Sequence, residues 1–173
     1  MKSLVAIAVL LCACPLLARG GSAADFHLEI RLTRGERSKD SNSSTTVLTI
    51  SGGKLVYRTI SGRRLSGRAV APREFTLTAQ DQKTIIKLIM DRKLLRTASI
   101  ERERDVPGIY RYFELSINAV VDGNEGLINI KASRKATDLK EDELYKDSIA
   151  LIDQIYEIIH RFDKDLDYEP LIP

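Results

Sequence analysis

The chain has 173 residues, of which 43% are hydrophobic and 29% are charged, and its formal net charge is +3 at neutral pH. This length corresponds to one domain, which can bury enough apolar surface to fold without covalent cross-links. The nearly balanced charge argues against nucleic acid as a partner, because nucleic-acid-binding domains present a clear basic excess.

The first 24 residues have the order of features found in a signal peptide. Lys2 supplies a positive start, residues 4–11 form a short apolar segment, and Pro15 would break a helix there. The small residues Ser22-Ala23-Ala24 then precede the first acidic residue. Signal peptidase requires this arrangement, so cleavage near Ala24 is predicted and the protein is expected to be exported, either periplasmic or secreted.

Two other interpretations of this segment stay open. Residues Leu11-Cys12-Ala13-Cys14 are similar to a lipobox, in which Cys14 would carry a lipid and anchor the protein. The segment could also be kept as an uncleaved anchor or as part of the core. A membrane span needs about 20 apolar residues, however, and Pro15 and Arg19 interrupt this one.

Removal of the leader would leave a chain without cysteine. Loss of Lys2 and Arg19 leaves 25 basic and 24 acidic residues. Thiol nucleophiles, disulfides, iron–sulfur clusters and Cys-ligated zinc are then excluded. The two histidines, His27 and His160, cannot supply the four ligands of a structural zinc site. We therefore expect no cofactor and no metal, in a fold held by packing alone.

The first half of the remaining chain predicts strands and loops. Residues 26–32 alternate apolar and polar side chains, which is typical of a strand with one buried face. The polar stretch 34–44 is predicted to be a loop. Two β-rich runs, 45–50 and 55–60, flank the sequence SGGK and predict a hairpin. Residues 61–73, rich in glycine and arginine, are predicted to form an exposed loop.

A helix is predicted to begin after Thr78, an N-cap with the carboxylate of Asp81 three residues later. A polar stretch, 97–109, follows this helix and is predicted to be a loop. A second hairpin is expected over residues 112–132, where Asp122-Gly123 and Gly126 are predicted to turn the chain.

The last element is predicted to be a helix from about residue 141 to residue 162, because apolar residues keep helical spacing there. The predicted fold is α+β: an antiparallel sheet of about five strands with two helices packed on one face. A single domain, 25–162, would lie between the leader, 1–24, and an acidic tail, 163–173.

Four arginines in one predicted loop are the candidate binding residues: Arg63, Arg64, Arg68 and Arg73. Guanidinium groups bind carboxylates and phosphates through paired hydrogen bonds, so this loop could contact a protein partner or a polyanion. The alternative is that the arginines only keep an exposed loop soluble. The loop has no aromatic residue on which bases could stack, which again disfavours nucleic acid.

No catalytic constellation is recognisable. No serine lies in a GxSxG context, and GRRLSGR lacks the lysine of a phosphate-binding loop. A pair of carboxylates, Glu114 with Glu103 or Asp105, could serve a hydrolase, but these residues equally suit a solvated surface. We therefore predict a protein that is not an enzyme.

The segments LEIRLTRG, FTLTAQDQKTIIKLI, YFELSINAVVDGNEG and LYKDSIALIDQIYEII occur in this order within residues 26–162. In element order the chain resembles emfourin-type inhibitors of thermolysin-like metalloproteases, and this resemblance implies a secreted protease as the partner. The Gly-Gly that this family carries after its first strand is replaced here by RGERSKDSNSS, so no inhibitory residue is transferred from the family.

The sequence thus predicts an exported, non-catalytic domain that binds another protein through loops 34–44, 61–73 and 97–109. The alternative is an envelope-associated lipoprotein, or a polyanion-binding module, that acts through the arginine-rich loop. The oligomeric state is left open.

Overall fold

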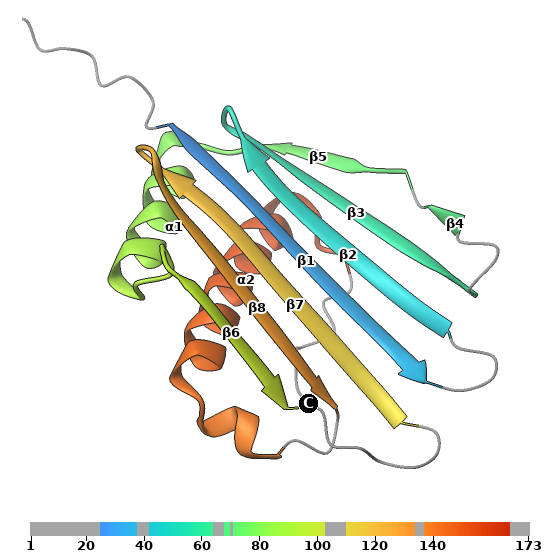
Figure 1. Cartoon of the computed structure of the whole chain (residues 1–173). Helices are drawn as coiled ribbons and strands as arrows, with labels where there is room; N and C mark the ends of the chain where they lie inside the picture. Colours follow the sequence, from blue (N-terminus) through green and yellow to red (C-terminus); the bar gives the residue numbers. More distant parts are fainter. Residues whose placement is uncertain are drawn as a thin grey trace, which may run out of the picture.

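The structure is a computed structural model that describes residues 25–37, 42–63, 68–69, 71–102, 110–133 and 137–166. The leader, with the predicted cleavage and lipidation sites at Ala24 and Cys14, lies outside the described residues. Figure 1 shows two layers, a broad twisted sheet and two helices that lie against one of its faces. The α+β class and the placement of both helices on one face are confirmed.

The sheet contains β1 Phe26–Arg37, β2 Asn42–Ser51, β3 Lys54–Arg63, β4 Arg68–Ala69, β5 Arg73–Thr76, β6 Thr97–Arg102, β7 Tyr110–Val121 and β8 Asn124–Ser133. Seven strands follow the order β4-β3-β2-β1-β7-β8-β6, and β5 pairs with β3 beside β4. Every pairing is antiparallel except that of β6 with β8, which is parallel. The prediction of about five antiparallel strands is therefore wrong in the number of strands, and it is also wrong for the edge strand β6, which is parallel to its neighbour.

The core lies between the sheet and the helices. Alternate side chains of each long strand point toward the helices, as the period of two requires. The central ones are almost completely buried: Leu28, Ile30, Leu115, Ile117, Ile128 and Ile130. Burial of each such side chain contributes about 1.5–3 kcal/mol, so this layer supplies the main stabilisation of the described fold.

Helix α1, Ala79–Asp91, begins as predicted. The hydroxyl of Thr78 accepts a hydrogen bond from the Asp81 amide at 3.1 Å, and the Asp81 carboxylate accepts one from the Thr78 amide at 3.0 Å. The reciprocal pair satisfies two backbone amides that the first helical turn leaves without partners. The predicted capping box is confirmed.

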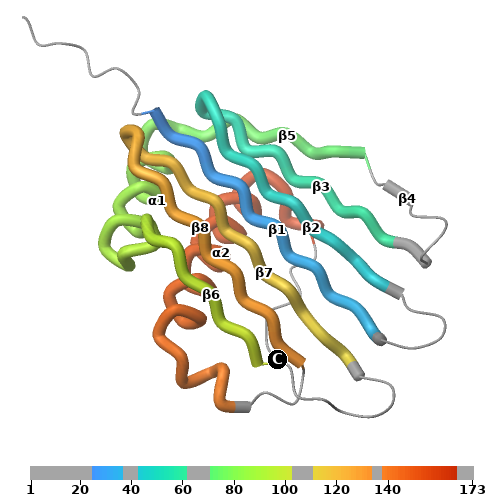
Figure 2. The backbone as a smooth tube through the Cα atoms, in the orientation of Figure 1, coloured from blue at the N-terminus to red at the C-terminus, as the bar shows by residue number. Residues whose placement is uncertain are grey.

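Helix α2, Glu143–Phe162, follows a short 3₁₀ helix, η1 Thr137–Glu141, and crosses behind the sheet (Figure 2). Three aromatic contacts mark its path. Tyr145 meets Phe113 of β7 at 6.0 Å between ring centroids, Tyr156 meets Tyr57 of β3 at 6.4 Å, and Phe162 meets Phe75 of β5 at 5.7 Å. One helix therefore joins the middle of the sheet to its β5 edge.

Both predicted hairpins are present, with two-residue turns that need positive φ. Gly52 and Gly53 have φ of 56° and 76°, and Asp122 and Gly123 have φ of 49° and 78°. Gly126 lies inside β8, so its predicted role in the turn is wrong.

The three predicted loops are shorter than expected. Strands β1 and β2 extend into 34–44, strands β3, β4 and β5 take up much of 61–73, and β6 begins at residue 97. Each of these polar segments pairs with a neighbouring strand, and pairing overrides the polar composition that predicted loops. Parts of these predicted loops lie outside the described residues: 38–41, 64–67, 70 and 103–109.

Candidate binding surface

The segments that contain the predicted binding loops leave the sheet at one end, which we name the loop end (Figure 1). Strand register establishes this arrangement. Arg37 at the end of β1 pairs with Tyr110 at the start of β7, and Arg63 at the end of β3 pairs with the first residue of β2. Arg102 at the end of β6 pairs with Ala132, near the end of β8. Segments far apart in the sequence thus converge on one end of a rigid sheet.

The structure places two of the four predicted arginines at the loop end. Arg63 is the last residue of β3, and Arg68 begins β4, where it pairs with Ser61. The register therefore brings their backbones close together. The side chains of both arginines, and the whole of Arg64, lie outside the described residues.

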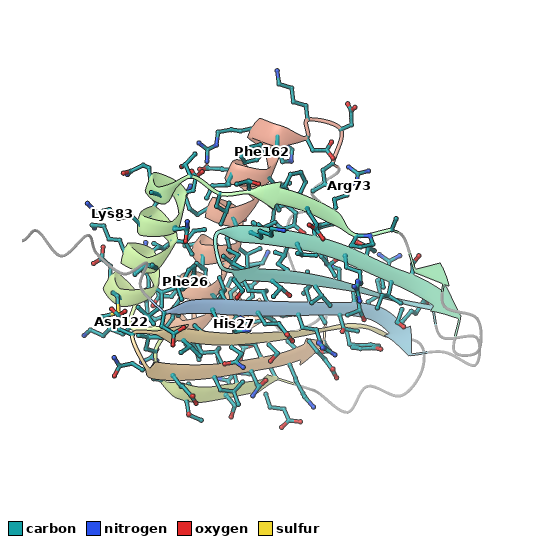
Figure 3. All side chains as sticks on the ribbon, turned by 90° about the horizontal axis from the view of Figure 1, so that it is seen from above. Phe26, His27, Arg73, Lys83, Asp122 and Phe162 are labelled. Carbon is teal, nitrogen blue, oxygen red and sulfur yellow. The ribbon has the colours of Figure 1, made fainter. Side chains whose placement is uncertain are left out.

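Arg73 differs from the other three because it has an internal partner. It begins β5, and its guanidinium forms an ion pair with Asp163, directly after α2. The neighbouring ring contact between Phe75 and Phe162 joins the same two elements, and Figure 3 shows Arg73 and Phe162 where α2 ends. Arg73 therefore fastens an edge strand to a helix, a structural role that its position in a basic loop did not indicate.

The first residues of the predicted acidic tail belong to the folded body. Asp163 pairs with Arg73, and the side chain of Leu166 is buried. Residues 167–173 lie outside the described residues.

Three further arginines lie at the loop end but were missed in the sequence: Arg37, Arg102 and Arg111. Arg111 is exposed and pairs by register with Glu36 of β1. The Arg102 guanidinium lies 3.6 Å from Asp138 and 3.9 Å from Asp142, so it also neutralises the start of α2. They were missed because they come from separate strands, and the only available signal was the register of those strands.

The sheet face opposite the helices, which we name the open face, is covered by no described helix or strand. The residues that point to it alternate with the core residues. Most are small or β-branched. On the paired strands β1 and β2 they include Thr33, Thr45, Val47, Thr49 and Ser51. At the loop end of this face the ring of Tyr112 lies over Gly35, where a Cβ would come within 2.7 Å of it.

The carboxylates considered for a hydrolase are not shown to form a pair. Glu114 lies on the open face, where it pairs by register with Thr33 and Lys131, while Glu103 and Asp105 lie outside the described residues. Among the described residues, no three His, Cys, Asp or Glu side chains are grouped to hold a metal ion. His27 lies on the open face.

Three buried titratable groups have a shifted pKa: Asp81, Tyr145 and Tyr156. Burial would raise the pKa of Asp81, but hydrogen bonds from Arg161 and Thr78 and the charge of Arg161 outweigh it and leave that pKa below its ordinary value. Burial raises the pKa of Tyr145 to about 12 and also raises that of Tyr156. Tyr145 and Tyr156 lie between α2 and the sheet, whereas Asp81 joins the start of α1 to the end of α2, so all three groups stabilise the fold.

No protein-family model matches the chain, and no curated protein matches its sequence. The resemblance to emfourin-type inhibitors therefore stays a prediction. Within the described part of the chain, no helix has the length and apolar character needed to cross a membrane.

Proposed function

We propose that the protein is an exported, non-catalytic domain that binds another protein through its loop end. One observation carries the proposal: strand register brings the strand ends that lie within the three predicted binding loops, at Arg37, Arg63 and Arg102, to one end of the sheet. Binding residues commonly lie on loops that a rigid scaffold holds together, and the two-layer core supplies that scaffold here. A secreted protease is the first partner to test, as the family resemblance implies.

A second candidate is binding of a polyanion or of an anionic envelope surface. The concentration of arginine at the loop end favours it, because Arg37, Arg63, Arg68 and Arg111 are placed there by register. Salt distinguishes the two candidates. Binding through exposed charges weakens as ionic strength rises, whereas a packed interface with desolvated anchors persists.

Export is tested first, by the intact mass of the protein purified from its natural host. A mass that begins at Asp25 supports cleavage near Ala24. A lipid-modified mass that begins at Cys14 would support the anchored alternative, and a mass that includes Met1 would refute export by cleavage.

The binding function is tested with a purified thermolysin-like metalloprotease, by measuring peptide hydrolysis as the mature protein is added. Inhibition is expected, and the double variant Arg63→Ala/Arg64→Ala should weaken it about 30-fold if the pair supplies one anchor worth about 2 kcal/mol. The matched control is Lys83→Ala/Arg96→Ala, since both residues are exposed and lie away from the loop end. Figure 3 shows Lys83 on α1, and the Arg96 carbonyl accepts a hydrogen bond from the Leu127 amide, at the opposite end of β6 from Arg102. This control should inhibit like the wild type.

The remaining outcomes separate the candidates. Absence of inhibition, combined with recovery of another protein that the arginine variant loses, would reject the protease but keep the binding function. Binding to polyphosphate that falls about tenfold from low to moderate salt would favour the second candidate. If neither a protein nor polyphosphate binds, the proposal is wrong.

A further inference from the structure

The charges of the open face are divided between its two sides. On the β3 side, Lys54 and Arg58 are exposed, and Glu74 of β5 lies 4.0 Å from Lys54. The other side carries one described cation and three described carboxylates on β6, β7 and β8: Lys131, Glu101, Glu114 and Glu125. The described side chains therefore give a net charge of +1 on the β3 side and −2 on the β8 side.

The middle of the open face is electrically neutral. Glu29 and Arg31 of β1 neutralise each other at 3.4 Å. Around them lie β-branched and small side chains, and the side chain of Leu127 on β8 is 41% exposed. Side chains of this size allow a second sheet to approach to the usual distance of about 10 Å.

We propose that the open face binds a second copy of this chain, with the two sheets face to face about a two-fold axis parallel to the strands. This axis places β3 of each copy over β8 of the other, so the basic side of one face meets the acidic side of the second. The other face-to-face arrangement, with the axis across the strands, would place β3 over β3 and bring Arg58 near its own copy. The distribution of charge therefore selects the first arrangement.

The size of the face suits such a dimer. Six strands spaced about 4.8 Å apart set the width of the face, and the stretch of β1 from His27 to Gly35, at about 3.3 Å per residue, sets its length. The product is a footprint on the order of 700 Å². A standard protein interface buries about 800 Å² on each partner. The many Ser and Thr side chains indicate a reversible association, since permanent dimers bury a more apolar surface.

The axis parallel to the strands has a further consequence. It keeps the strand direction, so both loop ends of the dimer point the same way and two copies of the arginine-rich end lie side by side. A partner with repeated sites would then be held by both, which raises the apparent affinity without new contacts. The dimer itself does not depend on what the loop end binds.

The test is the molar mass of the protein in solution, measured by sedimentation over a range of concentrations. The wild type is expected to move from monomer to dimer as its concentration rises. Lys54→Glu/Arg58→Glu and, separately, Glu101→Lys/Glu125→Lys should each weaken self-association at least tenfold. An equimolar mixture of the two variants should recover dimer, because the reversed charges again meet opposite charges.

Lys83→Glu on the outer side of α1 is the control and should dimerise like the wild type. Far-UV circular dichroism verifies that each variant is folded. A wild type that stays monomeric at every concentration would overturn the inference. So would a dimer that both double variants leave intact, or a mixture of folded variants that recovers no dimer.

Discussion

Replacement of Asp81 by asparagine tests how the two helices are held together. The Asp81 side chain is 6% exposed and accepts hydrogen bonds from the Thr78 amide at 3.0 Å and from the Thr78 hydroxyl at 2.7 Å. It also forms an ion pair with Arg161, in the last turn of α2. One carboxylate thus caps α1 and joins it to the end of α2.

The expected loss of stability at neutral pH is about 2 kcal/mol. Asparagine can still accept the bonds from Thr78, but without the charge that strengthens them, which costs about 1 kcal/mol. The ion pair adds about 1 kcal/mol, a low value for a charge-assisted bond because the Arg161 side chain is 58% exposed to solvent. In urea unfolding, the midpoint should fall by about 1 M.

The pH dependence gives the sharper test. The folded-state pKa of Asp81 lies below its ordinary value of 3.8, so the charge contributes its stabilisation above that value and loses it as pH falls through the folded pKa. The difference between wild type and Asp81→Asn should therefore be full at about pH 7 and smaller at about pH 3. Asp91→Asn is the matched control, because Asp91 is an exposed residue of the same helix whose pair with Lys87 is worth about 0.5 kcal/mol at most. An equal difference at both pH values would refute the role assigned to the Asp81 charge.

Three further changes have expected outcomes. Gly126→Ala should destabilise the protein by about 3 kcal/mol in thermal unfolding, because the new Cβ would lie 2.3 Å from the Leu94 carbonyl oxygen; an unchanged melting temperature would contradict this close packing. Burial raises the pKa of Tyr145 from its ordinary value of 10.0 to about 12. The neutral Tyr145 side chain therefore stabilises the folded state fully below pH 10, and this stabilisation is lost as the pH rises from 10 to about 12. Ultraviolet titration of Tyr145→Phe should lack this late ionisation, and a titration curve like that of the wild type would contradict the assignment. Arg73→Ala removes a partly exposed ion pair with Asp163 and should cost at most about 1 kcal/mol. A larger loss in urea unfolding would contradict the low value assigned to this pair.

Features that depend on neighbouring residues could be predicted from the sequence. The cap formed by Thr78 and Asp81, the hairpin turns and the long α2 helix all follow from local patterns, and the structure confirms them. Strand β6 could not be predicted in this way. Only Ala98 and Ile100 of its side chains are even partly buried, and the strand forms because β8 lies alongside it.

Gly126 shows a similar limit. A glycine close to Asp122-Gly123 predicted part of a turn, whereas its actual role is to let β8 pass close to the backbone of Leu94 and Leu95. Arg73 was grouped with other arginines because it is near them in sequence, but its partner Asp163 is 90 residues away. A local sequence pattern therefore predicts which secondary structure a segment can form, whereas the role of a residue such as Gly126 or Arg73 depends on residues far away in the sequence.

The open face contributes little to the stability of the fold, because the buried apolar core of the described residues lies on the helix side of the sheet. Its residues need only favour extended backbone, a requirement that threonine and valine meet at Thr45, Val47 and Thr49. Folding gives no reason for Arg58 on one side of this face and Glu125 on the other, since polar or β-branched residues would serve equally at both places. Assembly of two copies does give a reason, because a two-fold axis along the strands brings these opposite sides together.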